Sequence, residues 1–284
     1  NLSDKQIGSI VEFTVTPKEG EPICDVTHNY NSLFPSAIDA DGTGHYAFTV
    51  TEKNIIIVAM TPDKVGDTYE IADAGQLYWF AKQVNNGNTG INAVLTADIV
   101  VNENVLDDDG ELIGDGTGFI TWTPIGKDEE GKLYEGTFDG QGHTISGLYF
   151  NDENKSMVGL FCVTAKNSVI KNVGIADSYF RAYRHAAGIC GANDGVIDNC
   201  FSAATCAVSN LRVGGIVSWN GGTISNCHNV GIVSGPKRGA ICSDNTNGTT
   251  TNCYYLEGTA DAGIQAGSGE ATEMTASQFA SGEV

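Results

Sequence analysis

Three segments of the sequence decide the fold: GICGANDGVIDNC (188–200), GGIVSWNGGTISNC (214–227) and GAICSDNTNGTTTNC (239–253). Each segment joins two short apolar runs through turn-forming residues and ends in an Asn-Cys pair. The pairs begin at Asn199, Asn226 and Asn252, so the period is 27 and then 26 residues. A fixed period of this size is typical of stacked structural repeats.

The composition of the repeat predicts strands rather than helices. Its apolar runs are too short to show a helical period, and turn formers such as Asn-Gly-Gly at 220–222 separate them. One repeat cannot bury its own apolar face, whereas stacked repeats can, with strands in register about 4.8 Å apart. The sequence therefore predicts an all-β fold, a right-handed parallel β-helix in which like side chains stack on like.

Two columns of stacked side chains follow from this register. A column of asparagines is expected inside the β-helix, with each side-chain amide bonded to the next; it comprises Asn172, Asn199, Asn226 and Asn252. The adjacent column is expected to fill the core with small apolar groups; it comprises Val173, Cys200, Cys227 and Cys253. Because stacked positions seldom offer disulfide geometry, most of the eight cysteines are expected to be free and buried.

The repeat resembles the GLUG repeat of bacterial surface proteins. The resemblance rests on residues 214–227 and on two lead-in segments, TWTPIG (121–126) and GTFDGQGHTISGL (136–148), and it covers about Asp67 to Gly258. It implies a β-helix on a bacterial cell surface, in an extracellular, adhesin-like or polysaccharide-associated protein. Some members lie beside a zinc peptidase, but none of the five histidines here begins a His-Glu-x-x-His motif.

The first part of the chain reads as a separate unit. Residues 1–62 are predicted to form a small β module, and residues 63–284 are predicted to form the β-helix. Two segments, VEFTVTPKEGEPICDVT (11–27) and DGTGHYAFTVTEKNIIIVAM (41–60), resemble the internalin-type B-repeat and similar bacterial surface modules. That resemblance implies a spacer or a contact surface.

One amphipathic helix is predicted at 74–84. Asp73 is its expected N-cap, and Gln76 three residues later suggests a capping box. Its apolar residues recur at helical spacing along one face. A lone helix ahead of a β-helix is expected to cover the end of the stack, which would otherwise expose unpaired strand edges.

Composition narrows the classes of partner. The net charge of −20 argues against nucleic acid and anionic membranes, which both require clustered cations. The longest apolar stretch has the length of a strand, so no membrane insertion is expected. We expect an extracellular monomer without a required cofactor, whose partners are host or environmental glycans or surface proteins.

An acidic loop offers one candidate metal site. Asp107, Asp109 and Glu111 bring several carboxylates together, and calcium prefers oxygen ligands of this kind. The spacing lacks the alternation and the distal glutamate of an EF-hand loop. A solvated loop is therefore the alternative to a calcium site.

The arginines are distributed unevenly, since all four lie between residues 181 and 238. Counting back from the repeat glycines aligns a row of cations along one edge of the stack: Lys155, Arg184, Arg212 and Lys237 or Arg238. The positive charges in such a row repel each other unless anionic groups neutralise them. These groups could be protein carboxylates or an acidic polymer, such as a uronic-acid glycan. The predicted ligand-binding set is Arg181, Tyr183, Arg184, His185, Arg212, Trp219 and Arg238.

Three functions remain open at this point: a non-catalytic adhesion or glycan-contact module, a polysaccharide-active lyase or glycosidase, and a rigid spacer. An enzyme would use the loop that contains Arg181, Arg184 and His185. Arginines paired with protein carboxylates favour a spacer, and arginines open beside Tyr183 and Trp219 favour binding. An ionisable base at a sugar-sized cleft favours an enzyme.

Overall fold

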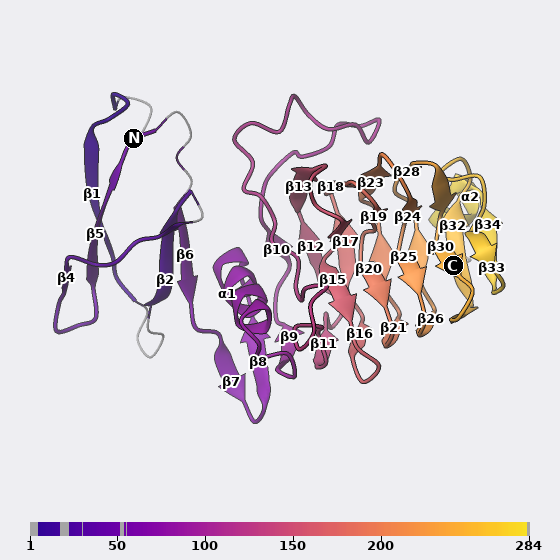
Figure 1. Cartoon of the computed structure of the whole chain (residues 1–284), viewed down its shortest axis with the longest axis horizontal. Coiled ribbons are helices and arrows are strands. Elements are labelled where there is room, and N and C mark those ends of the chain that lie inside the picture. The colour runs from indigo at the N-terminus through magenta and orange to yellow at the C-terminus, as the bar shows by residue number, and fades with distance from the viewer. Residues whose placement is uncertain (1–4, 18–22, 30, 52–53, 55, 283–284) are drawn as a thin grey trace.

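Two small antiparallel sheets precede the β-helix (Figure 1). The computed structural model describes residues 5–17, 23–29, 31–51, 54 and 56–282. The first sheet contains β1 (Ile10–Val15), β5 (Gly44–Thr49) and β4 (Ala37–Ile38) in that order. The second contains β3 (Asn31–Ser32), β2 (Ile23–His28) and β6 (Ile56–Met60). Parts of both segments that resemble a B-repeat, at 18–22, 52–53 and 55, lie outside the described residues.

Five further sheets run along the β-helix in the described part of the chain. The longest contains β7 (Asp63–Val65), β8 (Thr68–Ile71), β9 (Asn92–Leu95), β11 (Thr137–Asp139), β16 (Val169–Lys171), β21 (Val196–Asp198), β26 (Thr223–Ser225) and β31 (Thr249–Thr251). The next contains β10 (Ile99–Val100), β12 (Thr144–Ser146), β17 (Gly174–Ala176), β22 (Phe201–Ser202), β27 (His228–Asn229), β32 (Cys253–Leu256) and β34 (Ala271–Met274).

Three shorter sheets complete each coil. The first contains β13 (Tyr149–Asp152), β18 (Tyr179–Ala182), β23 (Thr205–Val208) and β28 (Val233–Ser234). The second contains β14 (Met157–Val158), β19 (His185–Ala186), β24 (Arg212–Gly214) and β29 (Lys237–Gly239). The third contains β15 (Phe161–Thr164), β20 (Cys190–Asn193), β25 (Val217–Asn220), β30 (Cys242–Asn245) and β33 (Ile264–Gly267).

The predicted fold class is confirmed: the chain forms a parallel β-solenoid of about 7 turns. Like side chains stack on like, as Ile170, Ile197 and Ile224 show by pairing in register across β16, β21 and β26. All three are fully buried, and they belong to one core that extends along the β-helix. Stacking therefore supplies the apolar burial that a single repeat lacks.

The helix α1 (Ala74–Asn85) covers the N-terminal end of this core (Figure 1). Asp73 is its N-cap, and its carboxylate accepts a hydrogen bond from the Gln76 backbone N–H at 2.8 Å. The Gln76 side chain accepts from the Ala72 N–H rather than from the Asp73 N–H, so the predicted capping box is incomplete. Phe80 is fully buried, and its ring centroid lies 5.8 Å from that of Phe138 in the first full coil.

The predicted asparagine column exists, but its expected position inside the β-helix is wrong. Asn199, Asn226 and Asn252 are exposed, and Asn172 is half-buried. The four residues have φ values between 49° and 54°, in the left-handed region that asparagine tolerates better than most residues. They form the corner between two sheets, which turns the asparagine outward and the following residue inward.

This outer asparagine row is also interrupted. The Asn199 amide donates to Asn172 Oδ1 at 2.7 Å, and the Asn252 amide donates to Asn226 Oδ1 at 2.7 Å. The Asn226 amide instead donates to Asp198 Oδ1 at 2.7 Å. The expected continuous chain of amides therefore breaks between Asn199 and Asn226.

A second asparagine ladder, which the sequence reasoning missed, lies inside the β-helix. The Asn193 amide donates to Asn220 Oδ1 at 2.8 Å, and the Asn220 amide donates to Asn245 Oδ1 at 2.7 Å. The Thr164 hydroxyl donates to Asn193 Oδ1, and the Asn245 amide donates to the Ser268 carbonyl. These three asparagines are at most 1% exposed. Asn193 and Asn220 stand where the sequence suggests only turn formers.

The column that follows the outer asparagines lies in the core. Val173, Cys200, Cys227 and Cys253 are all at most 2% exposed. Of the cysteines whose side chains the structure describes, all are free and buried: Cys162, Cys190, Cys200, Cys206, Cys227, Cys242 and Cys253. Burial raises the pKa of Cys190 and Cys206 far above the ordinary thiol value. These thiols behave as small apolar core groups.

Candidate functional site

Strands β14, β19, β24 and β29 present one column of side chains to the outside. The pairing places Met157, His185, Arg212 and Lys237 in register on successive coils. Their neighbours Val158, Ala186 and Val213 are fully buried and face the core. Successive side chains of a strand point to opposite faces, so the residue next to each buried one lies on the surface. This alternation places the cationic side chains of Arg212 and Lys237 on the surface of consecutive coils.

The predicted row of cations is confirmed for Arg212 and Lys237, which pair in register, and is wrong for Lys155 and Arg184, whose places in the column are taken by Met157 and His185. Arg212 pairs with His185 and Lys237, so Arg184 lies one residue before the column rather than in it. Arg238 pairs with Val213, one residue after the column. The two errors have different causes. Arg184 precedes Gly188 by four residues, whereas Arg212 precedes Gly215 by three. Arg238 is misplaced because the structure pairs Gly239 with Gly214, whereas the sequence alignment matches it with Gly215.

Three of the four arginines have a carboxylate partner. Arg212 Nη2 lies 2.8 Å from Asp244 Oδ2, on the next coil. Arg181 and Arg238 form exposed pairs with Glu153 at 2.6 Å and with Asp261 at 2.7 Å. The arginines at 181 and 238 are thus neutralised outside the column.

Asp244 holds Arg212 in place within the column. Burial acts to raise the pKa of Asp244, but hydrogen bonds from Thr246 and the charge of Arg212 outweigh it and hold that pKa below its usual value. Asp244 therefore stays ionised at neutral pH. Its side chain is 11% exposed and that of Arg212 is 27% exposed, so water screens this pair less than the exposed pairs.

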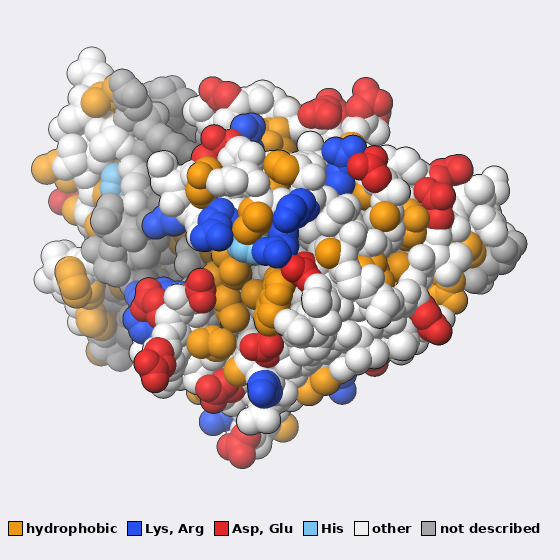
Figure 2. Space-filling view, turned by 45° about the vertical axis from the view of Figure 1, so that its right-hand side comes forward, with side chains coloured by type: hydrophobic (Ala, Val, Ile, Leu, Met, Phe, Trp, Pro, Cys, Tyr) orange, Lys and Arg blue, Asp and Glu red, His pale blue; other side chains and the backbone are white. Residues whose placement is uncertain are grey.

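Arg184 and Lys237 are the cations left open here. Both are exposed, and neither has a carboxylate within 4.0 Å among residues 56–282. We call Arg184, His185, Arg212 and Lys237 the cationic patch. Figure 2 shows Lys and Arg side chains gathered around a histidine on one face of the molecule, next to hydrophobic side chains.

His185 is neutral in this setting. Its Nδ1 lies 3.0 Å from Ser218 Oγ, and the Ser218 hydroxyl donates to the Arg212 carbonyl at 3.0 Å. Because the Ser218 hydroxyl proton is used in the bond to the Arg212 carbonyl, the bond between His185 and Ser218 must be donated by His185 Nδ1–H to Ser218 Oγ. The other ring nitrogen, Nε2, then carries a lone pair. Burial, together with the charges of Arg212 and Arg184, lowers the pKa of His185 to about 4.

The Ser218–His185 contact resembles half of a nucleophilic dyad but cannot act as one in this conformation. Ser218 is fully buried beneath the column, and its proton points at a backbone carbonyl rather than at the imidazole. A nucleophile must reach a substrate and pass its proton to a base. The pair therefore fixes the orientation of His185.

An apolar strip borders the patch. Trp219 and Met157 pack against a small cluster of Cys162, Val163 and Ala192 that is separate from the main core. Trp219 pairs in register with Asp244, the partner of Arg212, so the indole lies one strand from the cationic column. Tyr183, 44% exposed, precedes Arg184 in the turn that joins β18 to β19. The structure thus gathers five of the seven predicted ligand-binding residues: Tyr183, Arg184, His185, Arg212 and Trp219.

Sequence reasoning missed Asp244 and Ser218. Asp244 directly precedes Asn245, just as Trp219 directly precedes Asn220, so alignment on the interior asparagines could have placed it beside Arg212. Ser218 carries no such signal, because a serine in a strand is common and its role depends on a neighbouring coil.

The acidic loop is organised by its own backbone. Asp107 Oδ1 accepts from the Asp109 N–H at 3.0 Å and from the Glu111 N–H at 2.9 Å. Within the described residues, no three side chains of histidine, cysteine, aspartate or glutamate lie together as a metal-binding group. The loop continues over β23, where Thr205 Oγ1 donates to the Gly110 carbonyl. Its observed contacts hold the loop against the β-helix.

Comparisons with known proteins give surface-type relatives. No family model matches the chain. A "putative Gly-rich membrane protein" of Evansella cellulosilytica is 32% identical over 81 residues, which are 28% of this chain and 9% of that protein. Halomucin of Haloquadratum walsbyi is 28% identical over 151 residues, 52% of this chain and 2% of that protein. The chain therefore spans less than a tenth of either relative.

One solved structure follows a similar chain path. It is the crystal structure of a "putative immunoglobulin A1 protease" from Bacteroides ovatus, at 17% identity and a TM-score of 0.43. The match covers 75% of this chain and 85% of that one. Within the described residues, the helices are also too short and too polar to cross a bilayer. The chain is similar to parts of surface-type proteins.

Proposed function

We propose that the chain is a non-catalytic, extracellular contact module of a surface protein, and that its cationic patch holds acidic glycans. The proposal rests chiefly on Arg184 and Lys237, which flank the Arg212–Asp244 pair and have no carboxylate partner in the described part of the chain. In a chain of net charge −20, two open cations on the coils on either side of Arg212 are unusual unless a ligand uses them.

The chemistry of the patch suits a carboxylated sugar. The guanidinium of Arg184 and the ammonium of Lys237 can donate hydrogen bonds to carboxylate oxygens, and Nε2 of neutral His185 can accept a hydrogen bond from a sugar hydroxyl. Tyr183 and Trp219 add aromatic surface at its border. Each exposed ion pair contributes only about 0.2–1 kcal/mol, so a long polymer with repeated contacts would bind better than a single sugar.

The surroundings of the site extend the proposal. The coils would be GLUG-type repeats, and the two N-terminal sheets would be a B-repeat-like module that positions the β-helix on a cell surface. The relatives support a surface location by their names alone. Glycans or other surface proteins would be the partners, and the stiff stack would hold the patch away from the cell.

Retention on immobilised polygalacturonate, compared with neutral dextran, tests the proposal. The variant Arg184→Ala/Lys237→Ala removes two open cations, and Arg181→Ala/Arg238→Ala removes the same charge from pairs outside the column. The first variant should bind about tenfold more weakly, since two exposed ion pairs are lost. The second should bind as the native chain does, and added salt should weaken native binding.

Two results would refute this function. Equal losses in both double variants would show that only overall charge matters, and absence of native binding would remove the ligand class. The same incubation also tests the lyase alternative, because eliminative cleavage creates unsaturated sugars that absorb ultraviolet light. Their release would replace the contact module with an enzyme.

A further inference from the structure

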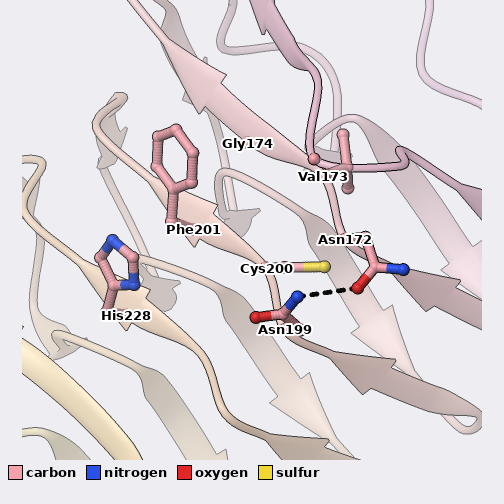
Figure 3. A pocket seen from close by; sticks show the side chains of 8 residues that line it. Asn172, Val173, Gly174, Asn199, Cys200, Phe201 and His228 are labelled. Atoms are coloured by element: carbon pink, nitrogen blue, oxygen red, sulfur yellow. Dashed lines mark hydrogen bonds between the residues drawn. The ribbon is translucent and has the colours of Figure 1, made fainter. Parts of the chain in front are cut away.

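A second site lies on another face of the β-helix, over β17, β22 and β27. It is a pocket of about 200 Å³ where the outer asparagine row meets the outer surface of that sheet. Asn172, Asn199, Phe201 and His228 line it (Figure 3). Drug-sized pockets hold about 300–1,000 Å³, so this pocket has room for one ring rather than a larger ligand.

A glycine creates the space for its aromatic wall. Gly174 pairs in register with Phe201, and a Cβ atom on Gly174 would lie 2.1 Å from the Phe201 ring. The ring therefore lies over the position that a side chain would occupy on the preceding coil. Phe201 is half-buried and faces outward, so the core does not require its aromatic face.

Two rings share one orientation along this wall. The Phe201 and His228 rings are 5.3 Å apart between centroids, with only 8° between their planes. Figure 3 shows both rings turned the same way without eclipsing each other. Phe279, from the terminal helix α2 (Ala276–Ser281), contacts His228 with its centroid at 5.8 Å. The rings are therefore held in place before any ligand arrives.

Unused hydrogen-bonding groups border the rings. The Asn199 amide donates to Asn172 Oδ1, while the Asn226 amide donates to Asp198 Oδ1 instead of to Asn199 Oδ1. The break in the outer asparagine row thus leaves Asn199 Oδ1 without a donor among the described residues. The His228 ring nitrogens likewise have no hydrogen-bond partner there, and burial keeps the pKa of His228 below 6.5, so the ring is neutral at neutral pH.

We propose that this pocket binds one uncharged pyranose ring of a hexose glycan. The slightly positive C–H face of the sugar would lie on the negative face of the Phe201 ring. One sugar hydroxyl would donate to Asn199 Oδ1, and a second would bond a His228 nitrogen. The lining contains no lysine, arginine, aspartate or glutamate, which separates this ligand from the acidic glycan of the cationic patch. The two sites lie on different sheets, and neither proposal depends on the other.

Saturation-transfer NMR tests the assignment, with cellohexaose, mannohexaose and maltohexaose as three separate neutral probes and oligogalacturonate as an acidic comparison. Phe201→Leu keeps an apolar side chain but removes the flat π face, and Phe201→Ala removes the ring. Tyr254→Ala is the matched control, since Tyr254 stands in the same outer column, next to His228, but does not line the pocket. Thermal unfolding of each variant checks that the fold is intact.

We expect transfer to the C–H protons of at least one hexasaccharide, an affinity about tenfold lower in both Phe201 variants, and no change with Tyr254→Ala. The proposal is overturned if the native chain gives no transfer to any of the three, or if Phe201→Leu binds as the native chain does. Transfer only to oligogalacturonate, abolished by Arg184→Ala/Lys237→Ala, would also overturn it while leaving the cationic patch in force.

Discussion

Asn193 and Asn220 lie one coil apart, and the Asn193 amide donates to Asn220 Oδ1 at 2.8 Å in the interior of the β-helix. Asn220 in turn bonds Asn245, and all three are almost completely shielded from water. A buried amide without a hydrogen-bond partner lowers the free energy of unfolding by about 1–3 kcal/mol. Each asparagine in this ladder supplies the partner that its neighbour requires.

Removing the middle of the interior ladder should be costly. Asn220→Ala leaves the Asn193 amide and Asn245 Oδ1 short of a partner, so the free energy of unfolding should fall by about 2–4 kcal/mol. Asn226→Gly, in the outer row, keeps the left-handed backbone without strain and loses only water-exposed bonds. It should cost less than about 1 kcal/mol. Urea midpoints of the two variants decide this, and equal midpoints would contradict the buried ladder.

Protonation of His185 should reduce stability in mild acid. Its pKa is about 4 in the folded chain against 6.5 in the unfolded one. The unfolded state therefore binds the extra proton as the pH falls from 6.5 to 4, and the free energy of unfolding declines across that window. If the ring were fully buried, this loss in the free energy of unfolding would be about 3 kcal/mol. Because the ring is partly exposed to water, we expect a loss of about 1–2 kcal/mol.

His185→Asn isolates that contribution, because its amide can still donate to Ser218. Urea unfolding of both proteins at neutral pH and at pH near 4 should show a smaller pH dependence in the variant. NMR titration of the imidazole gives the pKa directly. A midpoint near 6.5 in the folded chain would show that the ring is not shielded as described.

The end-covering role of α1 predicts a defect in assembly as well as in stability. Phe80→Ala removes a fully buried ring from its contacts with Tyr134 and Phe138, and should cost about 3–5 kcal/mol. Loosening the helix uncovers the strand edges of the first coils, so the variant should also self-associate more than the native chain.

Exposed Lys82 on the same helix provides the control. Lys82→Ala should change the free energy of unfolding, measured in urea, by no more than about 0.5 kcal/mol. Light scattering after size-exclusion chromatography measures association. A Phe80→Ala chain with native stability and native mass would mean that α1 is not needed to protect the stack.

The register of apolar side chains was predictable from the repeat, because burial repeats with the coil. Cys200, Cys227 and Cys253 recur at the period and lie in one buried column. The asparagines before them could not follow by the same logic. A residue with positive φ breaks the inward–outward alternation of a strand, so the neighbour of a buried cysteine can form an exposed corner.

The charged residues were harder to place because turns vary in length between coils. Cys206 pairs with Val233, whereas Arg212 pairs with Lys237, so the turn before Lys237 is two residues shorter than the turn before Arg212. This shortening brings Lys237, rather than Arg238, into the column of Arg212. The sequence could locate the arginines in one region but could not show that Arg212 meets Asp244 across a coil. The Phe201–His228 pocket was also missed, since it depends on a glycine that lies a full coil earlier.

The outer corner at Asn199 and Asn226 also makes a coil exchangeable at the level of the gene. Deleting residues 200–226 would join Asn199 to Cys227 and place that cysteine on Val173, with later columns keeping their order. Duplicating the same residues would lengthen the β-helix by one coil. A one-residue length change inside a strand would turn buried side chains outward. The turns between strands absorb other changes, because Cys206 pairs with Val233 but Arg212 pairs with Lys237, two residues closer. Natural variation in this architecture should therefore consist of whole coils or of residues added to or lost from the turns.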